Sequence, residues 1–433
     1  MYRFILEGVV ELPERFAGRG IRYHFHLSRG DEAQDNPLHR LARRAALVLT
    51  DDFPASVVPH RSSRLAAWVH VPVLAIDGNG IVPLAAIPGE QYGAYTLRPR
   101  IHRLLPEHFR PIPEPEPERD SLGLSLDVPE TRVSAETIDA LIADSPITHT
   151  VPPSPIYRGG RQEAVTRLAR FIAGPLSEYG TARNQPGAER TSRLSAYLHF
   201  GQIAVQEVAL GVREASAVAA EHREAYLEEL IVRRELAFNF CRYNPHHRSL
   251  EGLPSWARET LQAHAADPRP RLYSSRELDA ARTHDYLWNA IQAELLTTGT
   301  MFGYYRMYWG KKIIEWSRTP AEAQVTMIRL HEKYALDGRD PNTYSNILWC
   351  FGKHDRPWFE RPVFGTVRYM SLGGMETKTD AAAYVERVNR WCAEAGRPDL
   401  RVTAPARPRR AKRSTRREDA PMPRVDWSYH RPG

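Results

Sequence analysis

Residues 287–316 read LWNAIQAELLTTGTMFGYYRMYWGKKIIEW, and the same stretch continues through LHEKYALDGRDPN (330–342) to NILWCFGKHDRPW (346–358). Five of the nine Trp of the chain lie between Trp288 and Trp358. A core made only for packing favours Leu, Ile and Val, and it takes up Trp where the indole N–H finds a partner. The stretch therefore predicts helices whose aromatic side chains do more than fill a core.

The helical spacing of this stretch extends toward the N-terminus. Apolar residues recur at i, i+3, i+4 and i+7 from about residue 133 onward, which is typical of amphipathic helices. Together these segments predict a large, nearly all-helical domain over residues 133–400. The segments are 134–145, 161–180, 195–218, 223–243, 253–265 and 275–299.

The N-terminal part has a different pattern. Residues 20–27 and 45–50 are predicted to form short buried strands, and residues 64–76 a helix end that leads into a third strand. The segment DNPLHRLARRA (35–45) has helical spacing and lies between the first two, so the order is β-α-β and favours a parallel sheet. We expect a small α/β domain over residues 1–105, followed by a Pro-rich linker over 106–132.

The basic charge of the chain is concentrated in its last part. Residues 401–417 hold eight Lys and Arg and no acid, so without them the formal net charge of +7 becomes −1. A Pro-containing basic run of this kind is typical of a solvated arm, and in some proteins such an arm binds phosphates. We therefore predict a disordered tail over residues 401–433 and give the high pI little weight as evidence for DNA binding.

Composition and spacing exclude several classes of protein. No apolar run approaches the roughly 18 residues that span a bilayer, and we expect no signal peptide. Three widely spaced Cys suit a reducing cytosol and give neither a disulfide framework nor a zinc site. The 17 His form no HxxxH motif on a helix, so we predict no metal. These features predict a cytoplasmic, monomeric protein.

Three Trp have a spacing that permits two readings. Trp309 and Trp316 are seven residues apart and share one helical face, about 10 Å apart along the axis. Trp288 lies 21 residues before Trp309, on the preceding helix. Indoles spaced in this way relay single electrons to a redox cofactor, but packing between helices is the commoner reason for such spacing.

Charged side chains at apolar positions are also ambiguous. Arg306 needs a carboxylate or an anionic ligand, and the Asp337 turn offers the carboxylate. That ion pair either ties two elements together or borders a cofactor. Glu229 forms an i, i+4 pair with Arg233, which is usually a surface salt bridge, although a Glu in a cleft also hydrogen-bonds a bound base. Trp349 stacks either on a base or on the core.

A third group of polar residues lies upstream. Thr191, Ser192 and Ser195 open a helix, where hydroxyls and free N–H groups serve either to cap the helix or to bind phosphate. Tyr179 and Arg183 are four residues apart and share a helical face.

Taken together, these residues resemble the class II cyclobutane pyrimidine dimer photolyases of the photolyase/cryptochrome superfamily. The resemblance covers most of residues 150–375. It rests on long strings with fixed gaps: YLEELIVRREL (226–236), the 287–316 stretch, YALDGRDPN (334–342) and RPVFGTVRYMS (361–371).

The resemblance implies both a fold and a reaction. The fold is a Rossmann-like α/β domain, shortened here, followed by a helical domain that holds FAD. The reaction is light-dependent DNA repair: the excited reduced flavin passes an electron to a pyrimidine dimer flipped out of duplex DNA. Met307 and Trp349 are expected to hold the dimer, and Glu229 to hydrogen-bond its carbonyl edge and stabilise the radical anion. A nucleoid-associated location in the cytoplasm follows from the DNA substrate.

The resemblance also assigns cofactor residues. Arg183 and Asn184 match a pair at the flavin site, with Arg183 expected to pair with Asp355. Arg306 and Asp337 match an ion pair beside the isoalloxazine. The remaining matches are Tyr179, Thr191, Ser192, Leu194 and Ser195 for the phosphate and ribityl groups of FAD, and Trp309, Trp288 and Trp316 for the photoreduction chain.

The sequence departs from the family at four places. One follows RYMS (368–371), where the usual basic ending is absent and LGGMETKTD (372–380) takes its place. His331 stands where the class usually has Asn close to flavin N5, and because imidazole titrates near neutrality we expect pH-sensitive flavin states. Arg233 stands where some members have a second stacking Trp. The α/β domain is short, so we expect a second, antenna chromophore to be absent or poorly bound.

Two rival functions stand beside DNA repair, and His331, the short N-terminal domain and the basic tail motivate the first of them. One is a cryptochrome-like flavin photoreceptor, or a repurposed FAD protein, without repair activity. The other is a helical scaffold without a cofactor, which predicts a colourless protein.

Overall fold

The computed structural model describes residues 1–30 and 37–405, which form twenty α-helices and one small sheet. The basic tail beyond residue 405 lies outside the described residues, so its predicted disorder stays a prediction. The N-terminal elements are α1 Tyr2–Val10, α2 Leu12–Ala17, α3 Pro37–Arg44, β1 Val48–Asp51, α4 Val58–Trp68, β2 Val73–Ile76, η1 Leu84–Ala86, α5 Ala94–His108 and α6 Ile138–Ala143. The later elements are α7 Arg161–Ala173, η2 Pro175–Glu178, α8 Tyr179–Ala182, η3 Pro186–Ala188, α9 Ser195–His199, α10 Val205–Glu214, α11 Ala220–Leu227, a π-helix η4 Glu228–Arg233, α12 Arg234–Tyr243, η5 Leu250–Gly252, α13 Ser255–Ala263, α14 Ser275–Asp279, α15 Tyr286–Thr298, α16 Gly303–Trp316, α17 Pro320–Tyr334, α18 Pro341–Cys350, α19 Leu372–Lys378, α20 Ala381–Glu394 and η6 Pro398–Leu400.

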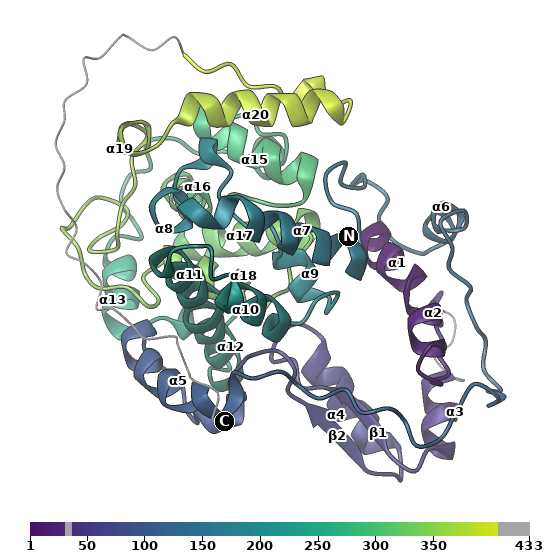
Figure 1. The fold of residues 1–433 in the computed structure, drawn as a ribbon. Coiled ribbons are helices and arrows are strands. Elements are labelled where there is room, and N and C mark those ends of the chain that lie inside the picture. Colours follow the sequence, from purple (N-terminus) through teal and green to yellow (C-terminus); the bar gives the residue numbers. More distant parts are fainter. Residues whose placement is uncertain (31–36, 406–433) are drawn as a thin grey trace.

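The sheet has two parallel strands joined through α4. β1 pairs with β2 in parallel in the register Val48↔Val73 to Asp51↔Ile76, which confirms two of the three expected strands. The β-α-β unit is β1-α4-β2, and not the expected unit in which residues 35–45 join a strand at 20–27 to one at 45–50. The strands are less buried than expected, because Leu49 is 61% exposed. In Figure 1 the sheet, α3 and α4 lie together at one end of the molecule.

The strand expected at residues 20–27 is wrong. This segment is extended, but its backbone groups bond the linker instead of β1: the Ser121 N–H donates to the Gly20 carbonyl at 2.8 Å, and the Thr131 N–H donates to the Phe25 carbonyl at 2.7 Å. Apolar alternation predicts an extended chain, but it does not tell which segment the chain pairs with. The Pro-rich linker is therefore fastened along part of its length.

Helix α1 packs against the helical body. The Phe4 ring lies 5.0 Å from the Tyr197 ring of α9, and Leu97 of α5 belongs to the same core. The backbones of α1 and of the segment before α7 lie so close together that a Cβ at Gly159 would be 1.8 Å from the Phe4 carbonyl oxygen. The domain boundary that we predict at residue 105 stays a prediction, but the first and last helices of residues 1–105 share the core of the helical part.

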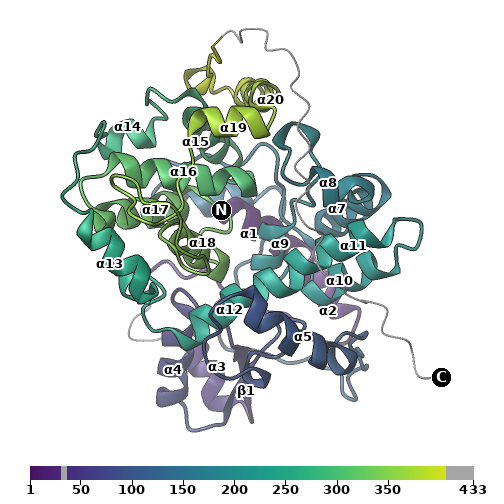
Figure 2. The same ribbon diagram turned by 90° about the vertical axis from the view of Figure 1, so that its left-hand side faces the viewer.

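The central helices begin and end where the sequence supplies caps. Asp285 accepts the Trp288 N–H at 2.9 Å at the start of α15, and Gly299 ends that helix with a φ of 76°. Asp340 accepts the Asn342 N–H at 2.9 Å, with Pro341 as the first residue of α18. The DGRDPN turn is thus held at the start of α18, beside α16 and α17 (Figure 2).

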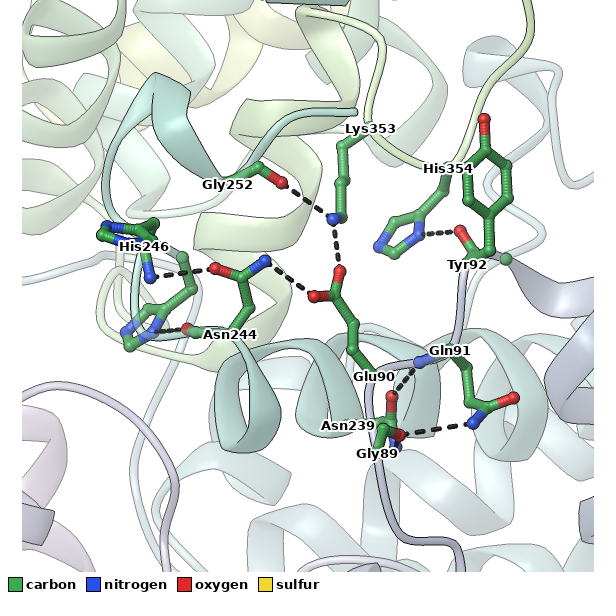
Figure 3. A network of polar contacts seen from close by, with 12 residues as sticks. Gly89, Glu90, Gln91, Tyr92, Asn239, Asn244, His246, Gly252, Lys353 and His354 are labelled. Atoms are coloured by element: carbon green, nitrogen blue, oxygen red, sulfur yellow. Dashed lines mark hydrogen bonds and ion pairs between the residues drawn. The ribbon is translucent and has the colours of Figure 1, made fainter. Parts of the chain in front are cut away.

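The loop before α5 is tied to α12 and to the segment after α18 (Figure 3). The Gln91 N–H donates to Asn239 Oδ1 at 2.8 Å. Lys353 donates to the Glu90 carboxylate and, at 2.8 Å, to the Gly252 carbonyl. Because Lys353 is only 6% exposed, its charge depends on Glu90 for compensation.

None of the helices among the described residues is both long and apolar enough to cross a membrane.

A double-mutant cycle tests the ion pair between the buried Lys353 and the exposed Glu90. We expect Glu90→Gln to lower the free energy of unfolding by about 3 kcal/mol, because it leaves an uncompensated buried ammonium. Adding Lys353→Met to Glu90→Gln should recover most of that loss, as measured by urea unfolding. Asp399→Asn, which breaks an exposed pair with Arg397, is the control and should cost less than about 1 kcal/mol. Additive losses in the double variant would contradict the interpretation.

Candidate functional site

Two adjoining cavities lie in the helical body. The inner cavity, of about 360 Å³, is enclosed by residues 189–198, the start of α16, the DGRDPN turn and Arg387 of α20. The outer cavity, of about 550 Å³, lies between α8, η4, α12, α18 and Arg368. Seven residues line both cavities, so the two form one connected space: Thr191, Glu229, Arg234, Phe302, Gly303, Asn342 and Asn346.

The inner cavity gathers most of the residues expected at the cofactor. Thr191, Ser192, Leu194 and Ser195 line it from the segment that enters α9, and Arg306 and Asp337 line it from α16 and the turn before α18. The Tyr226 hydroxyl donates to Ser192 Oγ at 3.0 Å and orients that side chain. Sequence motifs more than 100 residues apart therefore meet at one cavity.

Three polar atoms near the inner cavity are buried without a partner. They are Arg306 Nε, Asp337 Oδ1 and His331 Nε2. The expected Arg306–Asp337 ion pair is wrong, because no ion pair joins the two side chains among the described residues. The two residues border the same cavity without reaching each other, and each keeps hydrogen-bonding capacity. A buried polar atom left unsatisfied costs roughly 1–3 kcal/mol, so the site fits a polar ligand that contacts both groups.

His331 lies behind this cavity and is not among its lining residues. It is 1% exposed, and its Nδ1 lies 3.0 Å from the Met327 carbonyl, which fixes Nδ1 as the protonated nitrogen. Burial, together with the positive charge of Arg306, lowers the pKa of His331 to about 3. The expectation that this imidazole titrates near neutrality is therefore wrong, because the helical core keeps it neutral.

The three Trp of the expected relay are in contact. Trp309 stacks on Trp288 with ring centroids 6.3 Å apart and an interplanar angle of 3°. Trp316 meets the Trp288 ring at 5.6 Å. The His331 ring meets Trp309 edge-on at 5.1 Å, so the inner end of the row lies next to the site. All three indoles are at most 2% exposed.

The π-helix η4 positions two charged side chains in the wall of the outer cavity. An extra residue in a helical turn moves the following side chains around the axis, and such turns are frequent at functional sites. Here Glu229 and Arg233 both line the outer cavity, opposite Trp349 of α18. The Arg233 guanidinium lies 5.9 Å from the Trp349 ring centroid, so a cation–π pair forms part of the wall.

Arg183 has a different partner from the one expected. Its guanidinium lies 3.3 Å from the Glu229 carboxylate, whereas Asp355 pairs with Arg368 at 3.0 Å. The predicted Arg183–Asp355 pair is therefore wrong. Helix α8 ends beside η4, so the nearest carboxylate to Arg183 comes from that element. Tyr179 and Asn184 line the outer cavity beside it.

Met307 lines neither cavity, unlike Glu229 and Trp349, the other two residues expected to contact the substrate. Its sulfur lies 3.6 Å from Cys350 Sγ of α18. The thioether therefore packs between α16 and α18, and its expected contact with a substrate stays a prediction.

Sequence reasoning missed several lining residues. Asn342 and Asn346 line both cavities from one face of α18, and their spacing of four directly after the DGRDP turn was a usable signal. Arg234 is half-buried and its guanidinium donates to the Asn79 carbonyl, and the neighbouring arginines in VRREL gave no way to choose between them. Arg387 comes from α20, where no motif marks it.

Comparisons with known proteins agree with this geometry. No protein-family model matches the chain. A deoxyribodipyrimidine photo-lyase of Methanothermobacter thermautotrophicus is 39% identical over 388 residues, covering 89% of this chain and 83% of that protein. A protein of the same name from Oryza sativa subsp. japonica is 38% identical over 407 residues, covering 90% of this chain and 78% of that protein.

Solved structures share the fold. A cryptochrome of Synechocystis sp. PCC6803 aligns with a TM-score of 0.68 at 14% identity, over 93% of this chain and 80% of that one. A bacterial class III photolyase from Agrobacterium tumefaciens aligns with a TM-score of 0.59 at 17% identity, over 90% of this chain and 77% of that one. These alignments confirm the predicted fold class, a small α/β part with a large helical domain.

The neutral state of His331 predicts how stability depends on pH. Between about pH 6.5 and 3 the unfolded chain binds a proton at this imidazole and the folded chain does not, so stability falls as the pH falls. From pH 7 to pH 5 this residue alone should account for about 2 kcal/mol of lost unfolding free energy.

Urea unfolding of His331→Asn at both pH values measures this contribution. The variant should lose less stability on acidification than the parent. His60→Asn, at an exposed position, is the control and should behave like the parent. Equal acid sensitivity in His331→Asn and the parent would show that the imidazole titrates normally.

Proposed function

Because the chain belongs to the deoxyribodipyrimidine photo-lyase family, we propose that it is a light-dependent DNA repair lyase that uses FAD to split cyclobutane pyrimidine dimers. The observation that carries this function is the connected pair of cavities, with Glu229 in the wall that they share. A cofactor in the inner cavity and a pyrimidine dimer in the outer cavity would then both lie next to the Glu229 carboxylate. The strings around YLEELIVRREL and YALDGRDPN support the class II subtype.

The residues of the inner cavity fit FAD. Thr191 and Ser195 offer hydroxyls to the phosphate and ribityl groups, while Arg306 and Asp337 offer an unpaired guanidinium nitrogen and carboxylate oxygen to the polar edge of a flavin. Arg306 also provides a positive charge that favours an anionic form of the ring. When bound and reduced, FAD supplies the light-driven single electron. The chain's own contribution is to hold the ring beside Trp309 and Glu229 and to exclude water.

The outer cavity fits a flipped pyrimidine pair. Trp349 provides an aromatic surface for stacking, and Arg233 both covers that ring and offers a cation to DNA phosphate. Glu229, held by Arg183 at 3.3 Å, offers carboxylate oxygens to the polar edge of the bases. A dimer has already lost part of its stacking, so flipping it costs less than flipping intact bases. The selectivity for damaged DNA follows from this difference.

A flavin photoreceptor without repair needs only the inner cavity and the Trp row. Such a protein gains nothing from an open second cavity lined by Trp349, Arg233 and Glu229. This feature favours repair over the photoreceptor function. We further propose that the protein acts as a monomer on nucleoid DNA.

The direct test is photorepair by the purified, photoreduced protein. We expect thymine dimers in duplex DNA to be restored to thymines under blue light, as followed by chromatography of the digested DNA, with no change in the dark. A fully reduced protein that repairs no more than its dark control would exclude the repair function and favour the photoreceptor.

Variants of the outer cavity separate binding from chemistry. Glu229→Gln keeps the shape of the side chain, but the amide neither carries a negative charge nor exchanges a proton with the bound bases. It should lower the yield of splitting by about a hundredfold. Trp349→Ala should weaken binding of dimer-containing DNA by about 2 kcal/mol. Trp68→Ala, at an exposed position of α4, should change neither. Normal splitting and binding in both cavity variants would place the substrate elsewhere.

A further inference from the structure

His264, which directly follows the last residue of α13, has a carboxylate at each of its ring nitrogens. Its Nδ1 lies 2.6 Å from Asp267 Oδ2, and its Nε2 lies 2.9 Å from Glu360 Oε1. A neutral imidazole has one N–H group and one bare nitrogen, so it donates to only one of two such carboxylates. The imidazolium ion donates to both. The geometry therefore fits a protonated ring that bridges two parts of the chain.

The groups around this ring favour its positive charge. The hydrogen bonds with Asp267 and Glu360 raise the pKa of His264 above its ordinary value of 6.5. The end of α13 favours a cation as well, because the carbonyl groups of the last helical turn point there. Arg269 also packs here, but its guanidinium faces the backbone: it donates to the Asp267 carbonyl at 3.0 Å and lies 3.4 Å from the His264 carbonyl. Arg361 extends away from His264 and lies over an aromatic ring.

Glu360 belongs to a hairpin over residues 358–367, which an antiparallel bridge closes. The second arm of the hairpin, residues 363–367, is largely buried against the helical core. The first arm, residues 358–361, is exposed. The first arm therefore has little apolar burial to hold it, and its Glu360 carboxylate is the link to α13.

The second arm is fastened to the same end of α13 by bonds that do not titrate. The Val363 N–H donates to Asp267 Oδ2 at 2.8 Å, and the Thr366 N–H donates to Thr260 Oγ1 at 2.9 Å. The two parts lie so close together that a Cβ at Gly365 would be 2.0 Å from Thr260 Oγ1. Loss of the proton from the imidazole would thus free the first arm and leave the second arm in place.

The first arm supports one wall of the outer cavity. Trp358 Nε1 donates to Asp355 Oδ1 at 3.3 Å, and the Arg368 guanidinium lies 4.4 Å from the Trp358 ring centroid. Asp355 and Arg368 also form an ion pair at 3.0 Å. Because Arg368 lines the outer cavity, Trp358 is the contact through which the first arm positions a cation in that cavity.

We propose that His264 is a positioning residue of the outer cavity: its imidazolium ion holds the first arm of the hairpin against α13, and loss of its proton releases that arm and loosens Arg368. The attachment of the arm follows from the contacts of His264 with Asp267 and Glu360 alone. Its effect on the binding of a pyrimidine dimer rests on the proposed function.

The attachment has a definite direction with pH. The folded protein holds the proton of His264 more tightly than the unfolded chain, because the folded-state pKa is raised. The attachment is therefore complete below the ordinary pKa of imidazole, and it is lost as the pH rises through the raised pKa. Dimer-containing DNA should bind more tightly in mildly acidic solution than in mildly alkaline solution.

Hydrogen exchange of the full-length, FAD-loaded protein tests the attachment. After correction for the intrinsic pH dependence of exchange, peptides of the first arm should exchange about fivefold faster at about pH 9 than at about pH 6 in the parent. His264→Gln and Glu360→Ala should show the faster exchange at both pH values, and the second arm should be unchanged. Glu360 is exposed, so its truncation does not endanger the fold.

Affinity for duplex DNA with one thymine dimer, measured in the dark by fluorescence anisotropy, tests the consequence. The parent should bind about fivefold more tightly at about pH 6 than at about pH 9, at constant ionic strength. This ratio should shrink toward one in His264→Gln and in Glu360→Ala, while the yield of splitting per bound dimer stays that of the parent. His246→Gln breaks an exposed pair with Glu251 in the loop after α12, and as the control it should keep the ratio of the parent.

The outcomes distinguish the two levels of the inference. Exchange of the first arm that does not change with pH in the parent, or that changes equally in His264→Gln, would overturn the role of His264. Normal exchange behaviour with a pH-independent affinity for the dimer would overturn the effect on the outer cavity alone. Normal exchange behaviour without any preference for dimer-containing DNA would overturn the proposed function and leave the attachment of the hairpin intact.

Discussion

The burial of charge inside a helical core is the constraint on which the site depends. Arg306 and Asp337 come from different elements and border one cavity, yet each leaves a buried polar atom without a partner. Unsatisfied groups of this kind are unfavourable in a folded protein unless a ligand meets them. The caps of α15 and α18 and the packing of α16 between them hold these side chains at their positions. The fold therefore gives up stability at the place where it binds its cofactor.

The site was predictable where its residues belong to long local strings. Arg306 and Asp337, which belong to two such strings, line one cavity together with Thr191 and Ser195 from the start of α9. Pairings between strings were not predictable, because they depend on where helices end in space: Arg183 meets Glu229 and not Asp355. The protonation state of a side chain was equally hidden. His331 stays neutral because of its burial, which spacing does not reveal.

The fold shows the same division. Apolar periodicity located the helices after residue 133 and the strands β1 and β2, but not α1, α2 and α5 of the N-terminal part. The extended segment at 20–27 has the pattern of a strand, but its partner is the linker near Ser121 and Thr131. The partner of each backbone N–H and C=O group depends on how the whole chain folds. An alternation of apolar and polar residues does not specify that partner.

Electrostatics gives the Trp row a direction. Its inner end contacts the neutral His331, and the positive charge of Arg306 acts on that imidazole, so a positive charge on Trp309 is unfavourable. At its outer end Trp316 contacts the half-buried Tyr273 and the exposed His284. Within a low-dielectric core an attraction or repulsion of this kind extends over several residues. A positive charge is therefore less favourable at Trp309 than at the outer end of the row, where the rings beside Trp316 reach solvent.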